Sequence, residues 1–578
     1  MATVEHNVDF CVVGGGLAGI CAAIAAARNG IRTLLMHDRP VLGGNASSEI
    51  RVWICGAHGK NNRETGLLEE IQLENLYRNT TPNYSIWDTI LYEKVRFQEN
   101  LTLLLNCSCN DIVMEGNQIK SVSGWQLTTQ ARHTVKAKLF ADCSGDSILA
   151  PLSGAEYNHG RDAKSEFNEA AAPNTGDHKT MGMSCLMQMR EMDSPQPFTP
   201  PAWAHRYTAD EQLPNRPHDM KNFPGFVWIE LGGNQDTITD TEEIRDELLK
   251  TALGVWDHIK NRGEHNAGNW TLEWLGFLPG KRESRRYVGD YLLTENDIRS
   301  GGKFDDVIAY GGWPIDDHHP DGFDNKTAPW YGSMHPPVSS PYGIPYRTLY
   351  SKNIDNLFFA GRNISASHIG MSSTRVMGTC AMLGQAVGTA AAVAVKHNLS
   401  PRGVYKKKIT GLQDCLMRDD CYLPGMKRAI ATGCMNAELT ASNGDPEPLR
   451  NGHDRPEDGA DNSWSSAPGD WVEYRFDRPE KIDQVRLVFD SDLNRKTLNM
   501  VSCYPLKNTV FRPPSTLVKA FKLETQNTDG EWQTVYRTYN NYQRFVSIQL
   551  SGTFTALRCT VEETCGNDKV DIFSFDFS

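Results

Sequence analysis

Three glycines near the start of the chain have a spacing that lets a backbone bind phosphate. They are Gly14, Gly16 and Gly19, in the pattern G-x-G-x-x-G, and the acid Asp38 follows them. In such a pattern the first glycine permits a tight turn, the second lets a pyrophosphate approach, and the third lets a helix pack closely. An acid roughly 20 residues further on is expected to bind a ribose hydroxyl. The chemistry predicted here is dinucleotide binding.

The residues around the glycines predict the elements that such a turn needs. Residues 9–13 form an apolar run, residues 20–28 are rich in alanine and are followed by Gly30, and residues 33–36 are apolar again. The order strand, glycine turn, helix, strand and acid is that of a dinucleotide-binding βαβ unit. The start of the helix supplies free N–H groups and a positive dipole end for the phosphates. A glycine pattern alone is weak evidence, but here every flanking element is present.

Composition limits the other classes of function. A chain of 578 residues is too long for one hydrophobic core, so two or three domains are expected. Its formal charge is −12, and the short basic run 406–408 is isolated, so nucleic acid is not an expected partner. The fourteen cysteines are scattered, which favours reduced structural thiols, and no metal site is expected. The oligomeric state is left open.

The sequence also bears on the compartment. No apolar run approaches the 18 residues or more that a membrane-spanning helix needs, so no membrane partner is expected. Residues 1–7 are too few and too polar for a signal peptide, and the expected location is therefore the cytoplasm. A leader removed from the chain is left open.

A second glycine turn follows the second predicted strand. Residues 39–47 read R-P-V-L-G-G-N-A-S, and their Gly-Gly turn is placed to close over the same phosphates. Here the sequence resembles the flavoproteins with two dinucleotide-binding domains, and among them a bacterial family of FAD-dependent oxidoreductases with the pattern R-P-x-L-G-G-N-A-S. The resemblance implies FAD as the cofactor. His37 stands where the family has glutamate, so the ribose contact is assigned to Asp38.

Two later segments resemble further fingerprints of that family. Residues 137–146 form an apolar run that ends in Ser-Gly-Asp and resembles the A-T-G-D segment. Residues 356–362 end in Ala-Gly-Arg and precede an Ala- and Gly-rich helix predicted over 372–396. Related flavoproteins usually have aspartate where Arg362 stands, so Arg362 is expected at the pyrophosphate instead of the ribityl chain. The resemblance implies these cofactor-binding residues: Gly14, Gly16, Leu17, Ala18, Gly19, Asp38, Arg39, Gly43, Gly44, Asn45, Ala46, Ser144, Gly145, Asp146, Gly361, Arg362, Met371, Ser372 and Ser373.

The expected fold class is α/β with an added all-β domain. Residues 1–155 and 346–435 are expected to form a doubly wound FAD/NAD(P)-binding domain, and residues 156–345 an inserted α+β substrate domain rich in Trp, Tyr, His and Pro. Short alternating strands in 436–578 predict a β-sandwich. Its motifs W-V-E-Y-x-F and I-D-Q-V-R-L resemble the discoidin or galactose-binding-like module. Both a carbohydrate-binding role and a packing role are left open for it.

Two histidines are the candidate catalytic residues. Oxidation of an alcohol or amine by a flavin needs a group that removes a proton, and histidine is the usual base near neutral pH. His368 lies between the second fingerprint strand and its helix, and is the leading candidate. The run 316–319 reads Asp-Asp-His-His, and His318 in it is the second candidate, with a polar loop and a metal cluster as the alternatives.

The substrate is the least determined part of the prediction. Candidate substrate-binding residues are Arg285, Tyr342, Tyr346, Arg347 and Arg375, with solvent-facing arginines as the alternative. The expected activity is hydride transfer between FAD and a small polar substrate, a sugar or sugar derivative. The alternatives are a reductase, a redox-neutral flavoenzyme, and a carbohydrate-binding protein whose flavin domain is structural.

Overall fold

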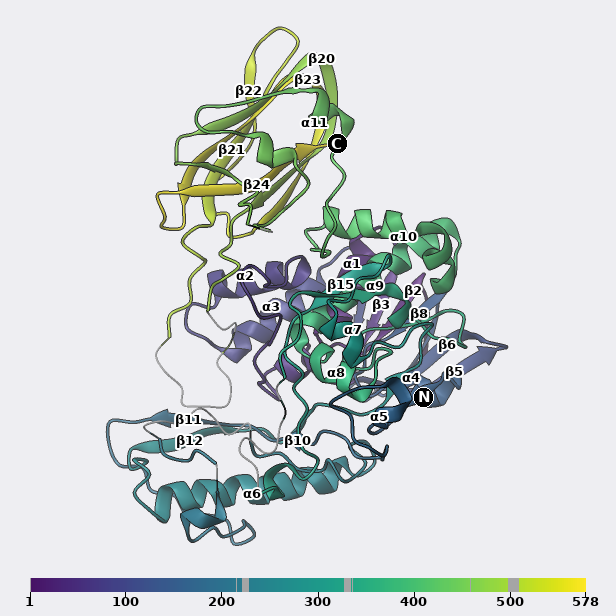
Figure 1. Ribbon diagram of the computed structural model, residues 1–578, viewed down its shortest axis with the longest axis vertical. Helices are drawn as coiled ribbons and strands as arrows, with labels where there is room; N and C mark the ends of the chain where they lie inside the picture. Colours follow the sequence, from purple (N-terminus) through teal and green to yellow (C-terminus); the bar gives the residue numbers. More distant parts are fainter. Residues whose placement is uncertain are drawn as a thin grey trace. The chain divides into compact units, whose positions relative to one another are not determined.

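The computed structural model describes residues 2–214, 216–220, 228–326, 334, 336–457, 459–496, 500 and 509–578 (Figure 1). The chain divides into two compact units. The first comprises Met1–Ala57, Thr81–Ile409 and Leu498–Thr509, and the second comprises His58–Thr80, Thr410–Thr497 and Val510–Ser578. The first unit thus contains most of the residues of the predicted nucleotide domain and the whole of the predicted insertion, and residues 58–80 belong to the second unit.

A parallel five-stranded sheet is the centre of the first unit. Its strand order is β17-β8-β2-β3-β4, which brings residues of the three predicted fingerprints together. The strands are β2 (Phe10–Val13), β3 (Thr33–Met36), β4 (Leu101–Leu104), β8 (Leu139–Asp142) and β17 (Leu357–Phe359). Strands β2, β3 and β8 are buried along their whole length, as expected for a covered parallel sheet. The predicted re-entry of the chain into the nucleotide domain is therefore present.

Helices α1 (Leu17–Arg28) and α9 (Met377–His397) pack closely against each other. A Cβ at Gly384 would overlap the carbonyl of Ala18, and a Cβ at Gly388 would overlap that of Ala22. By length and composition α9 is apolar enough to cross a membrane, but 89% of its apolar window is buried inside the protein. Its composition is therefore explained by its position in the core.

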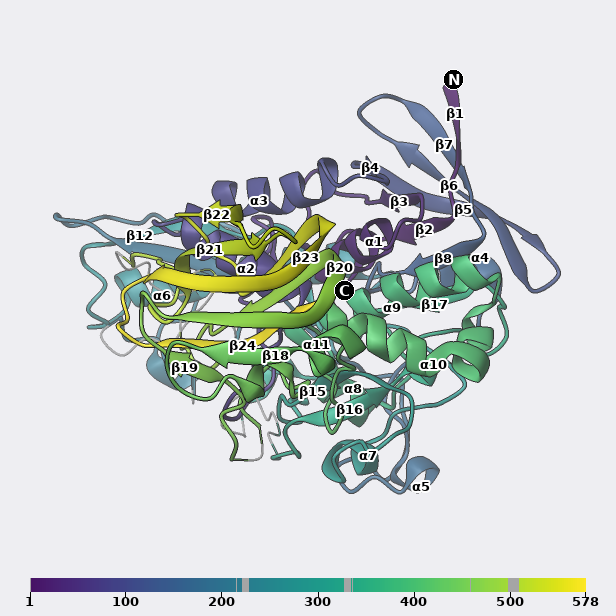
Figure 2. The same cartoon turned by 90° about the horizontal axis from the view of Figure 1, so that it is seen from above.

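A mixed sheet of four strands covers part of the parallel sheet. Strand order β1-β7-β6-β5 combines a meander with the first strand of the chain. Alternate side chains of the central strands, among them Cys11 and Val13, share a hydrophobic cluster with Val122 and Val135 of the meander. The strands are β1 (Ala2–Asn7), β5 (Cys107–Glu115), β6 (Gln118–Gln126) and β7 (Ala131–Lys136), visible near the N-terminus in Figure 2. The predicted meander is present, but it covers a face on which a doubly wound fold has helices.

The helix predicted over residues 372–396 is two helices in the structure. Helix α8 (His368–Thr374) ends at Arg375, and α9 begins after Val376, whose backbone is extended. The other helices of the first unit are α3 (Tyr84–Arg96), α4 (Leu149–Ser153), α5 (Lys164–Phe167), α6 (Thr241–Asn261), α7 (Glu295–Arg299) and part of α10 (Pro401–Arg418).

The insertion is an α+β segment built on one long helix. Figure 1 shows α6 beside the antiparallel strand pair β11 (Met187–Glu191) and β12 (Trp270–Leu275). Trp256 of α6 and Met187 of β11 belong to one buried cluster. The remaining strands pair as β9 (Tyr157–Asn158) with β14 (Arg286–Tyr287), β10 (Met183–Ser184) with β13 (Gly280–Lys281), and β15 (Val307–Gly311) with β16 (Tyr342–Pro345).

The second unit is a β-sandwich with a few additional helical segments. Strands β20 (Trp471–Phe489) and β23 (Phe545–Thr564) each combine two predicted strands, because bulges bend them without ending them. Their other partners are β18 (Glu438–Ala441), β19 (Trp464–Ser466), β21 (Val518–Gln526), β22 (Trp532–Thr538) and β24 (Val570–Phe577). Helix α2 (Leu67–Arg78) carries the buried Glu69, which pairs with Arg495, and α11 (Thr432–Asn436) precedes β18. This ion pair explains why residues 58–80 belong to the C-terminal unit.

Candidate active site

Two of the three glycines in the first turn are required by the packing of the fold, and the third is not. Gly14 has φ +105°, and a Cβ there would overlap the backbone at Cys143. A Cβ at Gly19 would overlap the carbonyl of Gly14. At Gly16, by contrast, φ is −68° and the nearest atom to an added Cβ is the Cα of Gly44 at 4.0 Å. Gly16 is thus a glycine at a position where an alanine would fit, which indicates that the missing side chain leaves room for a ligand.

The second glycine turn lies against the first. The N–H of Gly43 donates to the carbonyl of Gly15 at 2.8 Å, and Gly43 also forms an isolated parallel β-bridge with Gly16. Helix α1 begins after Gly16, with no side-chain cap on its first N–H groups. Uncapped N–H groups beside Gly16, which has free space where a Cβ would lie, form an anion site suited to a pyrophosphate. The predicted contacts of Leu17 and Ala18 would be made by these N–H groups.

The end of β3 differs from the pattern of related proteins in a way that the structure explains. His37 is buried, and its Nδ1 accepts a hydrogen bond of 3.0 Å from the N–H of Gly15. Asp38 has 61% of its side chain exposed, and its Oδ1 lies 3.3 Å from the same Nδ1. His37 therefore supports the glycine turn, while Asp38 stays available for the ribose contact predicted for it. Arg39 is paired with Glu49 at 2.7 Å.

The segment after β8 contains an ion-pair centre instead of a free acid. Asp146 bonds to Arg362 and to Lys281, each at 2.7 Å. Burial opposes its charge, but these two cations outweigh burial and lower the pKa of Asp146. The Ser144 hydroxyl donates to Asp142 at 2.6 Å, and a Cβ on Gly145 (φ +80°) would approach the Arg362 guanidinium. Asp146 thus fixes Arg362 at the second fingerprint.

Three other predicted cofactor residues have their side chains bonded within the protein. The Asn45 amide donates to the carbonyl of Lys281 at 2.9 Å. The Ser372 hydroxyl donates to the carbonyl of His368 at 2.9 Å, and the Ser373 hydroxyl donates to that of Trp313 at 2.5 Å. Ala46 and Met371 are buried, and Ala46 also accepts a hydrogen bond from Trp87. Any contact that these residues make with a cofactor would involve mainly their backbone.

His368 lies between two carboxylates. Its Nδ1 is 2.9 Å from Glu283 Oε1, and its Nε2 is 2.9 Å from Asp317 Oδ1. Burial opposes a charge on the ring, but Glu283 and Asp317 outweigh burial and raise the pKa of His368 to about 10. Near neutral pH the ring is therefore an imidazolium that donates from both nitrogens. This arrangement does not suit the predicted general base, which needs a neutral nitrogen directed at the substrate.

His318 has the same kind of surroundings. Its Nδ1 is 2.6 Å from Glu230 Oε2, and its Nε2 is 3.0 Å from Asp316 Oδ1. Burial opposes the charge, but Glu230 and Asp316 outweigh it and raise the pKa of His318. Glu230 is also buried, and Arg282 and His318 outweigh the cost of burial to lower its pKa to about 2. His318 is thus a paired cation as well.

The predicted substrate residues divide into core and ion-paired groups. Tyr342 and Tyr346 are fully buried, and their hydroxyls bond to Ser373 (2.6 Å) and to the carbonyl of Pro401 (2.9 Å). Arg347 makes a two-point pair with Asp306. These contacts count against Tyr342 and Tyr346 as substrate-binding residues, since a fully buried ring has no face to offer to a substrate.

Arg285 and Arg375 lie nearer to the fingerprints. Arg285 contacts the carbonyl of Asp146 at 3.4 Å and lies over the ring of Tyr157. Arg375 donates to the backbone carbonyl of Asp316 at 2.8 Å, and its Nε is buried without a hydrogen-bond partner. Of the five predicted substrate residues, Arg375 is the one whose free donor indicates a ligand.

A family model described as FAD dependent oxidoreductase matches residues 9–416. The chain belongs to this family. It is therefore an FAD-dependent enzyme, as the resemblance of its motifs implies.

Among solved structures, the chain is similar to isolated β-modules. The family 32 carbohydrate-binding module from Streptococcus pneumoniae EndoD is 17% identical, with 25% of this chain and 94% of that chain covered and a TM-score of 0.20. The family 32 module of C. perfringens NanJ in complex with galactose is 7% identical, with coverages of 26% and 97% and a TM-score of 0.19. Chitosan-binding module 1 of a chitosanase/glucanase from Paenibacillus sp. IK-5 is 16% identical, with coverages of 25% and 95% and a TM-score of 0.18. Values this low carry no inference about what the present chain binds.

The residues of this FAD-dependent oxidoreductase fit the cofactor. Besides Gly16, several buried polar atoms of residues 362–379 have no hydrogen-bond partner in the part of the chain that the structure describes. They are Arg362 Nε, Asn363 Oδ1, Ser365 Oγ, Thr374 Oγ1, Arg375 Nε and Thr379 Oγ1. Buried polar atoms are nearly always hydrogen bonded, so such a group indicates a polar ligand. Gly361, with φ +126°, lies close to Ala18 at the start of α1, which joins the two fingerprints into one site.

Several residues of this site were not predicted. Glu283, Asp317 and Arg286 form a buried cluster with His368, and Glu283 bonds to Arg286 at 2.6 Å. Asp162 joins the cluster by accepting from the backbone N–H of His368 at 2.7 Å. Adjacency to His318 was a signal for Asp317, since both lie in the Asp-Asp-His-His run. Glu283 and Asp162 have no such signal, because their partners are distant in the sequence.

Proposed function

We propose that this enzyme transfers a hydride between the flavin N5 of FAD and a polar, hydroxylated substrate, of which a sugar or sugar derivative is the expected class. FAD supplies the hydride chemistry when it is bound. The observation that carries the proposal is the set of partnerless buried polar atoms at residues 362–379, combined with the open Gly16. Both features favour a bound, functional cofactor over a structural remnant of a nucleotide fold.

The roles of the histidines follow from their ion pairs. His368 keeps its proton near neutral pH, so we assign it as a positioning residue that holds Glu283 and Asp317 in place. Its positive charge is fixed at the first residue of α8, whose N-cap Ser367 accepts from the N–H of Gly370. Because Ser367 already caps this helix, we expect the imidazolium and the arginines to supply the positive charge of this region.

The proposed substrate class rests on the polarity of the residues around the second fingerprint. Arg375 offers a buried Nε without a protein partner, and Oε1 of the buried Glu230 also has none. A donor and an acceptor of this kind match hydroxyl groups, which can both donate and accept. The insertion that contains Glu230 is rich in Trp, Tyr and His, which is typical of sites that bind polar ring compounds.

Anaerobic reduction of the flavin tests this proposal. The purified full-length chain, reconstituted with FAD if needed, should be yellow and should bleach on addition of its substrate from a panel of sugars and sugar acids. The variant Gly16→Ala serves as a matched control, because we expect it to fold without FAD. A wild-type chain that folds but cannot be loaded with FAD would refute the oxidoreductase proposal.

The same panel of compounds tests the cofactor assignment and the substrate class independently of each other. If the protein is yellow and no sugar or sugar acid bleaches it, the substrate class is wrong while the cofactor assignment stands. If no alcohol bleaches the oxidised enzyme, but one of the oxidised sugars reoxidises the chemically reduced enzyme, the enzyme acts as a reductase.

A further inference from the structure

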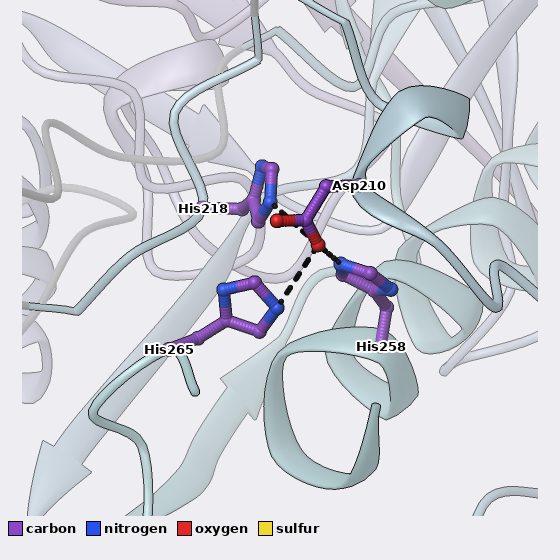
Figure 3. Close-up of side chains that lie close together, drawn as sticks. All are labelled: Asp210, His218, His258 and His265. Atoms are coloured by element: carbon purple, nitrogen blue, oxygen red, sulfur yellow. Dashed lines mark hydrogen bonds and ion pairs between the residues drawn. The ribbon is translucent and has the colours of Figure 1, made fainter. Parts of the chain in front are cut away.

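A group of three histidines and one aspartate lies in the insertion, away from the two fingerprints in the sequence. The residues are Asp210 in the 3-10 turn η2 (Asp210–Gln212), His218, His258 near the end of α6, and His265 after it. One ligand atom from each lies within 4.8 Å of the others, and Figure 3 shows the three rings arranged around the carboxylate. The ring centroids are 4.7 to 5.2 Å apart. These residues belong to neither of the clusters described above.

The backbone fixes which nitrogen faces the group. His258 Nδ1 lies 2.9 Å from the carbonyl of Tyr207, and His218 Nδ1 lies 2.5 Å from that of Arg216. A carbonyl only accepts, so both Nδ1 atoms carry hydrogen, and in the neutral rings the lone pair is on Nε2. Both Nε2 atoms face Asp210. A hydrogen bond from the other ring nitrogen to a backbone carbonyl is the usual way in which proteins orient metal-binding histidines.

His265 provides an independent indication of a ligand. Among the residues that the structure describes, its buried Nε2 has no hydrogen-bond partner, and the residue is only 7% exposed. This atom lies 3.5 Å from Asp210 Oδ1 and points into the group (Figure 3). A buried nitrogen with no partner costs free energy unless something binds it. The single negative charge of Asp210 could not neutralise three imidazolium rings.

Without an ion the arrangement is unfavourable both when all the rings are neutral and when several of them are charged. If the rings are neutral, the lone pairs of His218 and His258 face a carboxylate oxygen, and lone pairs repel. If the rings are charged, several imidazolium groups lie about 5 Å apart beside a single carboxylate, and like charges repel. A divalent cation at the centre removes both problems, because it accepts the nitrogen lone pairs and the carboxylate together.

The distances identify the kind of ion. Ligands at about 2.0–2.1 Å from Zn²⁺ in a tetrahedron lie about 3.3–3.4 Å from one another. The distances from Asp210 Oδ1 to Nε2 of His258, His265 and His218 are 3.1, 3.5 and 3.7 Å. Three imidazoles and one carboxylate suit Zn²⁺, whereas Mg²⁺ and Ca²⁺ prefer oxygen ligands alone. We propose that Asp210, His218, His258 and His265 form a Zn²⁺ site.

The ligand set indicates what the ion would do. Four protein ligands close the coordination shell, which is typical of structural zinc. They join η2, the segment at 218, the end of α6 and the turn that follows it. His258 is fully buried, and its neighbour Ile259 belongs to the hydrophobic cluster of the insertion. The ion would therefore attach the 207–218 segment to the end of α6, stabilising the insertion without taking part in hydride transfer.

The amino-acid sequence alone predicts no metal site, so this Zn²⁺ site departs from that prediction. The intervals of seven residues between His258 and His265 and of eight between Asp210 and His218 match no common zinc motif, and the two pairs are separated by 40 residues. Only the fold brings the pairs together.

A zinc titration of the full-length chain tests the site. The protein is freed of metal with a chelator, titrated with Zn²⁺ against a chromophoric competitor, and its metal content is measured by mass spectrometry. We expect one tightly bound Zn²⁺ per wild-type chain, and a melting transition that rises with added Zn²⁺. Loading with Co²⁺ should give the visible absorption of a tetrahedral site. A wild-type chain that binds no stoichiometric Zn²⁺ would overturn the proposal, and this outcome needs no variant.

Variants then assign the ligands. His265→Gln and Asp210→Asn should each lose the bound equivalent, while the matched control His397→Gln, which changes an exposed histidine at the end of α9, should keep it. Binding by the scattered cysteines would be the same in all four proteins, so a loss confined to the two ligand variants assigns the site. Equal zinc content in all of them would refute the assignment. FAD content, measured in parallel, reports on the flavin site and keeps failure of the two proposals distinguishable.

Discussion

The variant Gly16→Ala tests the assignment of the cofactor site most directly. An added Cβ would have its nearest neighbour at 4.0 Å, and the backbone at φ −68° and ψ 176° is one that alanine adopts freely. Alanine at a helix N-cap is less favourable than glycine by about 0.5 kcal/mol or somewhat more. The reduced entropy of the unfolded chain offsets this by about 0.4–1 kcal/mol. We therefore expect the free energy of unfolding to change by less than about 1 kcal/mol.

Binding of FAD should respond very differently. The new methyl group occupies the space in which a pyrophosphate would approach the backbone, so we expect FAD affinity to fall at least about tenfold, or about 1.4 kcal/mol. The measurements are the flavin absorbance of the purified protein and titration of the apoprotein with FAD, with circular dichroism and thermal unfolding as the test of folding.

Gly14→Ala is the matched control with the opposite expectation for stability. Its φ of +105° and its overlap with the backbone at Cys143 make the added Cβ a problem for the fold itself. Strain and overpacking are each expected to cost about 1–3 kcal/mol. If Gly16→Ala binds FAD as the wild type does, the glycine turn is not the pyrophosphate site. If it unfolds like Gly14→Ala, the separation of the two roles is wrong.

Three further predictions concern the buried charges and the helix contact. Glu283→Gln should lower the free energy of unfolding by about 3–5 kcal/mol, because it breaks buried pairs with His368 and Arg286. The control Glu273→Gln, in the exposed pair with Arg190, should cost at most about 1 kcal/mol; both are measured by chemical denaturation. Because the folded pKa of His368 is raised to about 10, its stabilising contribution is complete below the unfolded value near 6.5 and is lost as pH rises toward 10. The folded ring stays protonated between about pH 6 and 9, so anaerobic flavin reduction in His368→Gln should keep the shape of the wild-type pH profile in this range. Loss of a wild-type ionisation in this range would restore the general-base assignment. Gly384→Ala should destabilise the folded protein by about 1–3 kcal/mol, because its Cβ would overlap the carbonyl of Ala18. Gly411 is a helical glycine with open space around it, so the control Gly411→Ala should be neutral or stabilise the fold by up to about 1 kcal/mol; thermal unfolding measures both.

The parts of the fold that could be predicted are those in which local chemistry leaves few choices. The first fingerprint is one: Gly14 has a positive φ of +105°, and Gly19 lies against the carbonyl of Gly14 in the same turn, so their spacing indicates the turn. The parallel sheet follows from the order of the fingerprints. The covering of its other face does not, because an antiparallel meander and a layer of helices can bury the same alternating strand residues.

The candidate site was predicted less well for a similar reason. The position of His368 in the loop before α8 followed from the second fingerprint, but its charge did not. That charge is set by Glu283 and Asp317, which are 85 and 51 residues away in the sequence. A pKa depends on such neighbours more than on residue type, so one sequence cannot distinguish a histidine base from a buried imidazolium. Likewise, the exclusion of a metal relied on local spacing, which does not detect the group formed by Asp210, His218, His258 and His265.

The adjacent acids Asp316 and Asp317 give these ion pairs a consequence for function. Asp317 bonds to His368, while Asp316 bonds to His318 and also to Arg375, so one dipeptide of the insertion joins both histidine clusters to the second fingerprint. Separating the segments would leave buried charges without partners, at about 3–5 kcal/mol for each broken pair. Residues 316–318 and 368–375 should thus behave as one rigid element during turnover. The positions of Arg375 and of the partnerless polar atoms near it are therefore set before a substrate arrives, as a preorganised binding site requires.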